Sequence, residues 1–198
     1  MSAKEWIPVS LKGTYLATRS GTEYPTLHAA KEITLTQEGI EGDVHFGYTR
    51  RSTKSSLHLC PLGTEIRNNR QWSAASPSEI KTIEERLELS SGLTAELLGI
   101  NLEIEGAGPL TSLPGLTYLV FSDRPEFDPQ REDNVLLVVY GGILPCAKAG
   151  RAIGAALGNP SIETKFPDVA LGYRGTMGWV ERGGILRPGQ NGWILKPT

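Results

Sequence analysis

The chain has 198 residues, with 20 Lys and Arg against 22 Asp and Glu and a formal net charge of −2. This length suits a single domain over residues 1–198, and the near-neutral charge excludes a polycation that binds nucleic acid. The two cysteines, the absence of an apolar signal-peptide core and the lack of any apolar run near the ~20 residues that span a bilayer predict a reduced, cytoplasmic protein that does not enter membranes.

Turn-forming residues are frequent along the whole chain. Glycine and proline occur 23 and 13 times in the whole chain, which favours short strands joined by turns. Apolar and polar residues alternate over 31–37, a pattern typical of a strand with one wet face. The next segment, 39–51, crowds glycines with titratable groups. It is either a solvated turn or a place where backbone and arginines approach a ligand.

The clearest helix signal lies in the middle of the chain. Ser76 precedes a proline and stands three residues before Glu79, which predicts a capped helix start with a capping box. Apolar residues at 80, 83 and 87 then share one helix face. A shorter helix is predicted over 94–98, stopped by Gly99, and alternation over 101–105 predicts another strand.

The second half combines dense strands with one glycine-rich helix. Apolar runs predict buried strands over 116–121 and 135–140, with a charged loop between them that extends to 133. A helix is expected over 147–157, although its glycines cost up to ~1 kcal/mol each and favour close packing against a neighbour. Short strands over 178–181 and 192–195 follow. Strands interrupted by helices without βαβ alternation predict a mainly β fold with several helices, a mixed β-barrel rather than a doubly wound sheet.

Cys146 is the sharpest candidate for chemistry. It lies between a buried strand and a helix start, so the positive end of the helix dipole, Lys148 and Arg151 would favour its thiolate. Thiolate is both a nucleophile and a metal ligand. The alternative is a small apolar filler, as most free cysteines are. Cys60 has apolar neighbours without comparable charge and is predicted to be buried and inert.

Standard signatures of other chemistries are absent. Gly106-Ala107-Gly108 lacks the third glycine and the strand–helix context of a dinucleotide fingerprint. There is no Walker loop, no CxxC pair and no serine nucleophile elbow. The histidines at 28, 45 and 58 are too scattered for any standard zinc spacing.

Several segments, taken in order, resemble the MOSC family, named for the C-terminal domain of molybdenum-cofactor sulfurases. They are 39–45, similar to an early Gly-x-x-Gly-Asp-x-His block; 69–73 with the capped helix after it; 98–102, similar to Leu-Gly-Glu-Asn-Leu; Pro145-Cys146, which matches the hallmark cysteine; and 171–189, similar to the closing block. The match spans a core of about 13–195, and the pattern is most similar to the small stand-alone bacterial members.

The resemblance implies a β-barrel related to the small domain of pyruvate kinase, with the cysteine at a pocket. Family members are thought to bind the molybdenum cofactor (molybdopterin) or carry sulfur, and some reduce N-hydroxylated compounds with the cysteine ligating molybdenum. The fused pyridoxal-phosphate (PLP) desulfurase domain of some members has no room in this chain. A separate cysteine desulfurase or a reductase would then be the partner.

Carried onto this chain, the resemblance implies that Cys146 either accepts a persulfide or ligates molybdenum. Seven further residues would form the cofactor pocket: Gly42, Asp43, His45, Arg70, Asn101, Arg174 and Gly175. Asp43 and His45 would serve as hydrogen-bonding or proton-transfer groups. Arg70 and Arg174 would bind the cofactor's phosphate or pterin, or else Arg70 is a surface salt-bridge partner.

The remaining pocket residues have structural alternatives. Gly42 and Gly175 would let backbone approach the ligand, although Gly-Asp and Arg-Gly pairs are also ordinary turn chemistry. Asn101 would fix the loop geometry or donate to the ligand. The chain has Val44 where many members have arginine, and Ile100 where glutamate is usual, which removes two polar groups. These departures keep a further function open, a non-catalytic small-molecule binding module on the same barrel.

Overall fold

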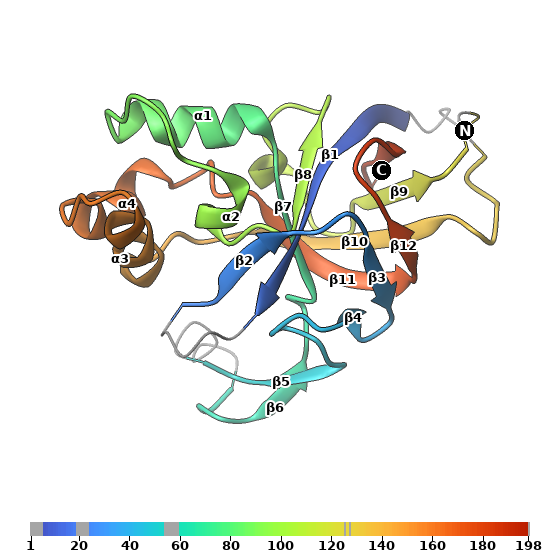
Figure 1. The fold of residues 1–198 in the computed structure, drawn as a ribbon. Helices are drawn as coiled ribbons and strands as arrows, with labels where there is room; N and C mark the ends of the chain where they lie inside the picture. The colour runs from blue at the N-terminus through green and yellow to red at the C-terminus, as the bar shows by residue number, and fades with distance from the viewer. Residues whose placement is uncertain (1–5, 19–23, 54–59, 125, 127, 198) are drawn as a thin grey trace.

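The computed structural model describes residues 6–18, 24–53, 60–124, 126 and 128–197 (Figure 1). Its strands are β1 (Trp6–Thr18), β2 (Thr26–Ala29), β3 (Ile33–Thr36), β4 (Gly39–Ile40), β5 (Thr49–Arg51), β6 (Glu65–Arg67), β7 (Trp72–Ala75), β8 (Leu102–Glu105), β9 (Tyr118–Ser122), β10 (Val135–Gly142), β11 (Thr176–Arg182), β12 (Gly184–Leu186) and β13 (Asn191–Leu195). Its helices are α1 (Pro77–Arg86), α2 (Ala95–Leu98), α3 (Ala147–Ala156), α4 (Ile162–Val169) and the short 3-10 helix η2 (Leu110–Ser112).

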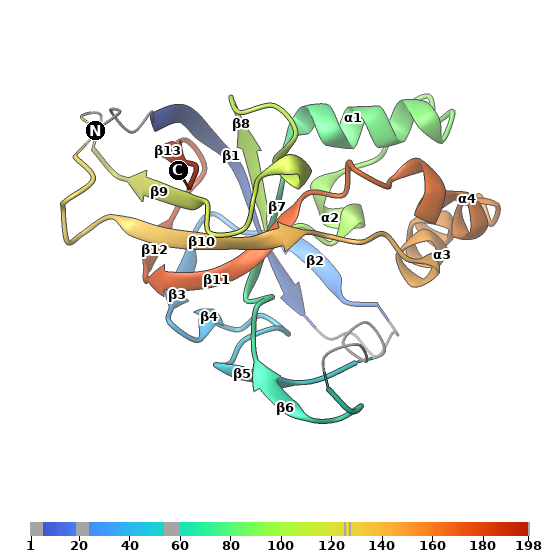
Figure 2. The same cartoon turned by 180° about the vertical axis from the view of Figure 1, so that it is seen from behind.

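Seven strands form a closed barrel in the order β13, β9, β10, β11, β7, β8 and β1. The ring closes where β1 pairs with β13, in a register that runs from Trp6 opposite Leu195 to Ser10 opposite Asn191. β7 and β8 are parallel, and the other barrel pairs are antiparallel. β2 extends the sheet beside the end of β1. In the view of Figure 2, β10 and β11 run side by side across the barrel on the side nearest the viewer.

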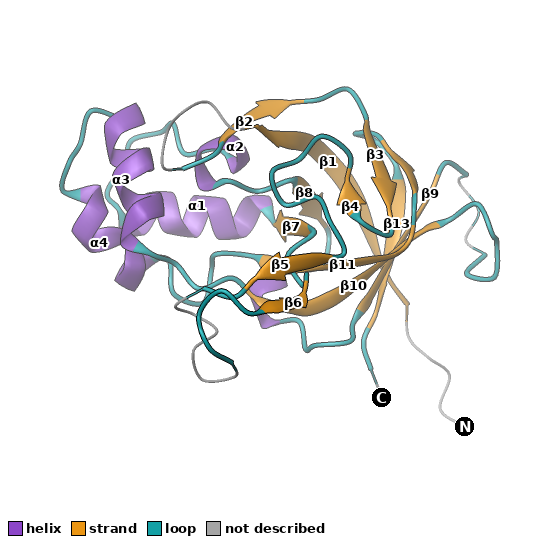
Figure 3. Cartoon of the chain, turned by 90° about the horizontal axis from the view of Figure 1, so that it is seen from below, coloured by secondary structure: helices purple, strands orange, loops and turns teal. Residues whose placement is uncertain are grey.

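The helices gather at one end of the barrel (Figure 3). Residues inside the barrel form one apolar cluster that includes Leu11, Trp72 and Leu119. A second cluster lies under the helices and includes Ile83 of α1 and Phe166 of α4. The mainly β barrel expected from the sequence is therefore confirmed, and its two cores meet where the helical layer joins the strands.

The predicted helices are confirmed, and their caps explain their ends. At the start of α1, Ser76 Oγ accepts from the Glu79 backbone nitrogen at 3.2 Å, and the Glu79 carboxylate accepts from the Ser76 nitrogen at 2.8 Å. α2 stops at Gly99, whose φ of 70° is left-handed. The glycines of α3 pack closely on α4, because a Cβ at Gly150 would lie 2.8 Å from the carbonyl oxygen of Ile162.

Some features differ from the sequence expectations. The pattern predicted no strand for β1, whose register shifts between Leu11 and Gly13, and no helix for α4, which carries Pro167 inside it. Cys60 was predicted to be buried, and this is wrong: it is half-buried because it lies in the connection between β5 and β6, next to the exposed Leu62. No helix in the described ranges has both the length and the apolar character needed to cross a membrane.

Candidate functional site

A cavity of about 230 Å³, here called the Cys146 cavity, opens where the barrel meets the helices. Five of the eight predicted site residues line it: His45, Arg70, Asn101, Cys146 and Arg174. Three of its described lining residues, Arg70, Lys148 and Arg174, carry permanent positive charge, and none is a carboxylate. Such a wall attracts an anionic ligand.

Cys146 stands at the N-cap of α3 and is exposed. Its side chain makes no capping hydrogen bond, and its carbonyl oxygen accepts from the Gly150 nitrogen at 3.2 Å. The loop before it is fixed to the barrel, because the Ile143 nitrogen donates to the Gly175 oxygen at 2.9 Å. The thiol is thus held by an ordered backbone while remaining open to solvent and to ligands.

Asp43 lies behind the cavity wall and organises it. One oxygen, Oδ1, accepts from the backbone nitrogen of His45 at 2.8 Å and lies 3.1 Å from its Nδ1. The other, Oδ2, accepts from Ala17 N and Asn101 Nδ2, both at 2.9 Å. Burial by itself raises the pKa of Asp43, but the hydrogen bonds from His45 and Ala17 outweigh it and leave this pKa lowered. Asp43 is therefore a carboxylate that keeps the proton of His45 on Nδ1, so that Nε2 is the ring nitrogen available to a ligand.

Asn101 stabilises the loop around it and does not offer a free hydrogen-bond donor to a ligand. Its Nδ2 donates to Tyr15 O at 3.1 Å and to Asp43, so both amide protons are used inside the protein. Its Oδ1 accepts from Ser73 Oγ at 2.9 Å. The neighbouring Ile100 is fully buried in the core under the helices. The geometry supports the loop-fixing alternative for Asn101.

Arg174 is a buried cation without a carboxylate partner among the described residues. It is only 4% exposed. Its Nη2 donates to the carbonyl oxygen of Leu98 and, at 3.2 Å, to the hydroxyl of Tyr24. Its Nη1 is buried and has no hydrogen-bond partner among the residues that the structure describes. A buried charged donor left unsatisfied costs more than a neutral one, so this nitrogen indicates that a polar or anionic group belongs beside it.

Arg70 brings a second guanidinium to the same wall. Water reaches it, yet protein atoms crowd it from the sides, as expected in a concave surface. This crowding lowers its pKa, as do the charges of Arg50 and Arg174, while Tyr24 and Cys146 act in the opposite sense. Arginine stays charged despite such shifts. The alternative of a surface salt bridge is not supported, since no ion pair to Arg70 occurs within the described ranges.

Gly42 and Gly175 do not line the cavity. Gly42 has a φ of 78° in the turn before Asp43, which suits glycine. Gly175 has a φ of 84°, and a Cβ there would lie 2.2 Å from the Ala74 oxygen of β7. Its nitrogen donates to Thr111 Oγ1 at 2.7 Å. Gly175 thus joins β7, η2 and the loop of Cys146, and its role is close backbone packing.

Sequence reasoning missed Tyr24, which lies beside Arg174 although 150 residues separate the two. No local signal marks Tyr24, because it belongs to no motif of the sequence. Trp72 and Met177 also line the cavity from β7 and β11 and supply apolar wall. Across the described residues, no three His, Cys, Asp or Glu side chains gather to hold a metal ion. A metal at Cys146 would thus depend on ligands brought by a cofactor.

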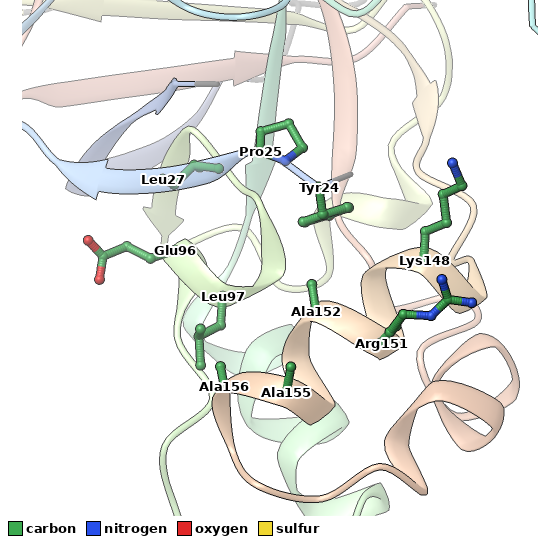
Figure 4. A pocket seen from close by; sticks show the side chains of 10 residues that line it. All are labelled: Tyr24, Pro25, Leu27, Glu96, Leu97, Lys148, Arg151, Ala152, Ala155 and Ala156. Carbon is green, nitrogen blue, oxygen red and sulfur yellow. The ribbon is translucent and has the colours of Figure 1, made fainter. Parts of the chain in front are cut away.

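A groove of about 480 Å³, here called the α2–α3 groove, adjoins the cavity (Figure 4). The two share four lining residues, Tyr24, Pro25, Leu27 and Lys148. Figure 4 shows Lys148 and Arg151 at one end, and the alanines of α3 facing Leu97 of α2. The Cys146 cavity therefore continues into a longer groove whose walls are mostly apolar.

A closed seven-strand barrel with an ordered cysteine in a cationic cavity defines the class of protein. The chain belongs to the MOSC domain family, whose family model matches residues 41–191. MOSC domains are associated with the molybdenum cofactor. The expected family is therefore confirmed.

Solved structures show the same fold. The YUAD protein from Bacillus subtilis matches with a TM-score of 0.86 and 26% identity, covering 98% of this chain and 100% of that chain. YiiM from Geobacillus stearothermophilus matches with a TM-score of 0.56 and 13% identity, covering 96% of this chain and 75% of that chain. A comparison with curated proteins gave no match.

Proposed function

We propose that this protein binds the molybdenum cofactor in the Cys146 cavity, with the Cys146 thiolate as the protein ligand of molybdenum. One observation carries the proposal: an exposed thiol and the unpartnered Nη1 of the buried Arg174 belong to the same cavity wall. Thiolate is a soft ligand suited to such metals. When bound, the cofactor would supply two-electron redox chemistry.

The residues of the cavity fit this group. The cofactor's organic part carries a phosphate, and Arg70 and Arg174 bring two guanidinium groups to a wall without carboxylates. His45 offers Nε2 as a site that holds or releases a proton, and Asp43 fixes the ring from behind. The adjoining α2–α3 groove leaves room for a second ligand beside the cavity.

Sulfur carriage is the second candidate, because the thiol is accessible from outside. Cys146 is exposed, and Leu144 two residues before it is 75% exposed. A cysteine desulfurase could therefore bring its persulfide to Cys146. The Cys146 thiolate would attack the terminal sulfur, forming a new S–S bond while the donor cysteine leaves as thiolate.

Metal and pterin analysis with intact mass, on protein from a molybdenum-replete host, tests the two candidates together. We expect stoichiometric molybdenum in the natural chain, its loss in Cys146→Ser and its retention in Cys60→Ser. Absence of metal together with the mass of one added sulfur, gained after incubation with a cysteine desulfurase, would replace cofactor binding by sulfur carriage.

A third result would reject both candidates. If neither metal nor added sulfur is found, and Cys146 reacts with iodoacetamide no faster than a free cysteine in solution, the cavity is a binding module without chemistry.

A further inference from the structure

The floor of the α2–α3 groove is unusual for a helix surface. Ala155 and Ala156 of α3 are exposed and Ala152 is half-buried, so small side chains stand where long polar ones are common. Leu27 and Leu97 face them from β2 and α2. A volume of about 480 Å³ with mostly apolar walls is within the range of small-molecule sites.

The groove is preformed because α3 is fixed from its other side. A Cβ at Gly154 would lie 2.6 Å from the Asn159 oxygen in the α3–α4 connection, and a Cβ at Gly150 would lie 2.8 Å from the Ile162 oxygen, so α3 packs backbone against backbone on this connection and on the start of α4. Arg151 forms an ion pair with Glu163 of α4 at 2.7 Å. A wall held in this way does not need to close on its ligand.

Charge is distributed unevenly along the groove. Glu96 is tied to β2, since its Oε1 accepts from the Ala29 nitrogen at 2.8 Å, and Figure 4 shows it pointing away from α3. Lys148 lies at the passage to the Cys146 cavity, where Arg70 and Arg174 follow. Positive charge is thus concentrated at the end of the groove that leads to the thiol.

We propose that the α2–α3 groove binds the substrate of this protein, an organic anion with an apolar body. The anionic head lies at the passage beside Lys148, and the apolar body lies on Ala152, Ala155 and Ala156. The inference rests on the proposed function, because it supplies the substrate for chemistry at Cys146. It identifies the substrate class as an aryl or alkyl acid rather than a neutral or cationic compound.

Two ring-matched probes test the groove on the full chain as purified. Sodium 2-naphthoate is the anionic probe and 2-naphthamide the neutral one, both titrated into ¹⁵N-labelled protein. We expect naphthoate to shift the amide signals of Ala152, Ala155 and Ala156 and to bind more tightly than naphthamide. In protein freed of molybdenum, where the Cys146 thiol is open to alkylation, bound naphthoate also slows the reaction of Cys146 with iodoacetamide, while the alkylation of Cys60 in the same molecule is unchanged.

Paired variants separate the apolar and the charged contributions. Ala156→Phe fills the groove and weakens naphthoate binding about tenfold, whereas Ala147→Phe, an exposed position of α3 outside the groove, does not. Lys148→Gln weakens naphthoate binding by about two- to fivefold and leaves naphthamide unaffected. Lys165→Gln, an exposed lysine on α4, changes neither.

The inference is overturned if naphthoate does not bind the natural chain, if it binds no better than naphthamide, or if Ala156→Phe binds it normally. A failure of the proposed function can be distinguished from a failure of the groove inference, because the Cys146→Ser protein lacks molybdenum but keeps the groove. Naphthoate binding to a natural chain without molybdenum or persulfide supports the groove and rejects the chemistry at Cys146. Molybdenum binding without naphthoate binding supports the proposed function and rejects the groove as the substrate site.

Discussion

The carboxylate of Asp43 holds His45 at two points, its backbone nitrogen at 2.8 Å and its ring Nδ1 at 3.1 Å. The side chain of Asp43 is fully shielded from solvent, whereas that of His45 is 39% exposed. The buried carboxylate of Asp43 therefore fixes the imidazole of His45, which solvent can still reach. The same carboxylate ties Ala17 and Asn101, so one side chain couples β1, the turn after β4 and the start of β8.

Asp43→Asn should lower the free energy of unfolding at neutral pH by about 2 kcal/mol, because it removes the charge from several buried hydrogen bonds. The folded-state pKa of Asp43 lies below its ordinary value of 3.8. The ionised carboxylate therefore stabilises the fold fully at pH values above 3.8, and this stabilisation is lost as the pH falls through the folded-state pKa. Urea denaturation from neutral to acidic pH should show a flatter profile for the variant. Asp168→Asn, at an exposed position of α4, is the control and should change stability by less than about 0.5 kcal/mol.

Arg174→Met should raise the free energy of unfolding of the ligand-free chain by about 1 kcal/mol, because it removes a buried charge without a carboxylate partner. The carbonyl oxygen of Leu98 keeps a donor, the Tyr24 hydroxyl at 3.3 Å. The same variant should lose molybdenum. Arg86→Met, which removes an exposed guanidinium that stacks over Tyr173, should keep both properties near those of the natural chain. A destabilised Arg174→Met protein that retains metal would contradict this account.

Gly175→Ala and Gly172→Ala form a matched pair, since both glycines have positive φ, 84° and 81°. At Gly172 a Cβ meets nothing within 4 Å, so only the backbone strain of about 1 kcal/mol remains. At Gly175 the Cβ collides with the Ala74 oxygen, and the cost should exceed that of Gly172→Ala by at least about 2 kcal/mol. Thermal and urea denaturation measure the difference, and equal costs would show that the contact with β7 is easily relieved.

Glu79→Ala should destabilise the fold by about 2–4 kcal/mol, because this buried carboxylate caps α1 and also accepts from the Thr111 nitrogen at 2.8 Å. Thr111 in turn accepts from the nitrogen of Gly175, so hydrogen exchange at the Gly175 amide should accelerate. Glu85→Ala, on the exposed face of the same helix, removes only a pair with Lys81 at 3.8 Å and should cost less than about 0.5 kcal/mol. An unchanged exchange rate at the Gly175 amide in Glu79→Ala would contradict the proposed coupling from Glu79 through Thr111 to Gly175.

Local signals predicted much of the fold because they depend on neighbours in the chain. The capping box of Ser76 and Glu79 was readable from spacing, as was the stop of α2 at Gly99. The strand β1 was not, because its register shift breaks the alternation on which such predictions rest. The same holds for α4, whose start has no side-chain cap and whose interior contains a proline.

The candidate site was predictable in part for the same reason. Cys146 precedes a helix and follows a buried strand, and both are local features. The position of Tyr24 beside Arg174 and the consumption of both Asn101 amide protons depend on how distant strands come together, which spacing alone does not encode. The second contact of Glu79, with Thr111, escaped prediction on the same grounds.

The pairing of β1 with β13 has a consequence for how the protein is made. The ring cannot close during translation until residues 191–195 have left the ribosome, because they are the partners of residues 6–10. Contacts between segments so far apart form slowly compared with hairpins and helices. The nascent chain therefore carries Cys146 before its barrel is closed, and any cargo of the finished cavity would be loaded only once residues 191–195 have joined residues 6–10.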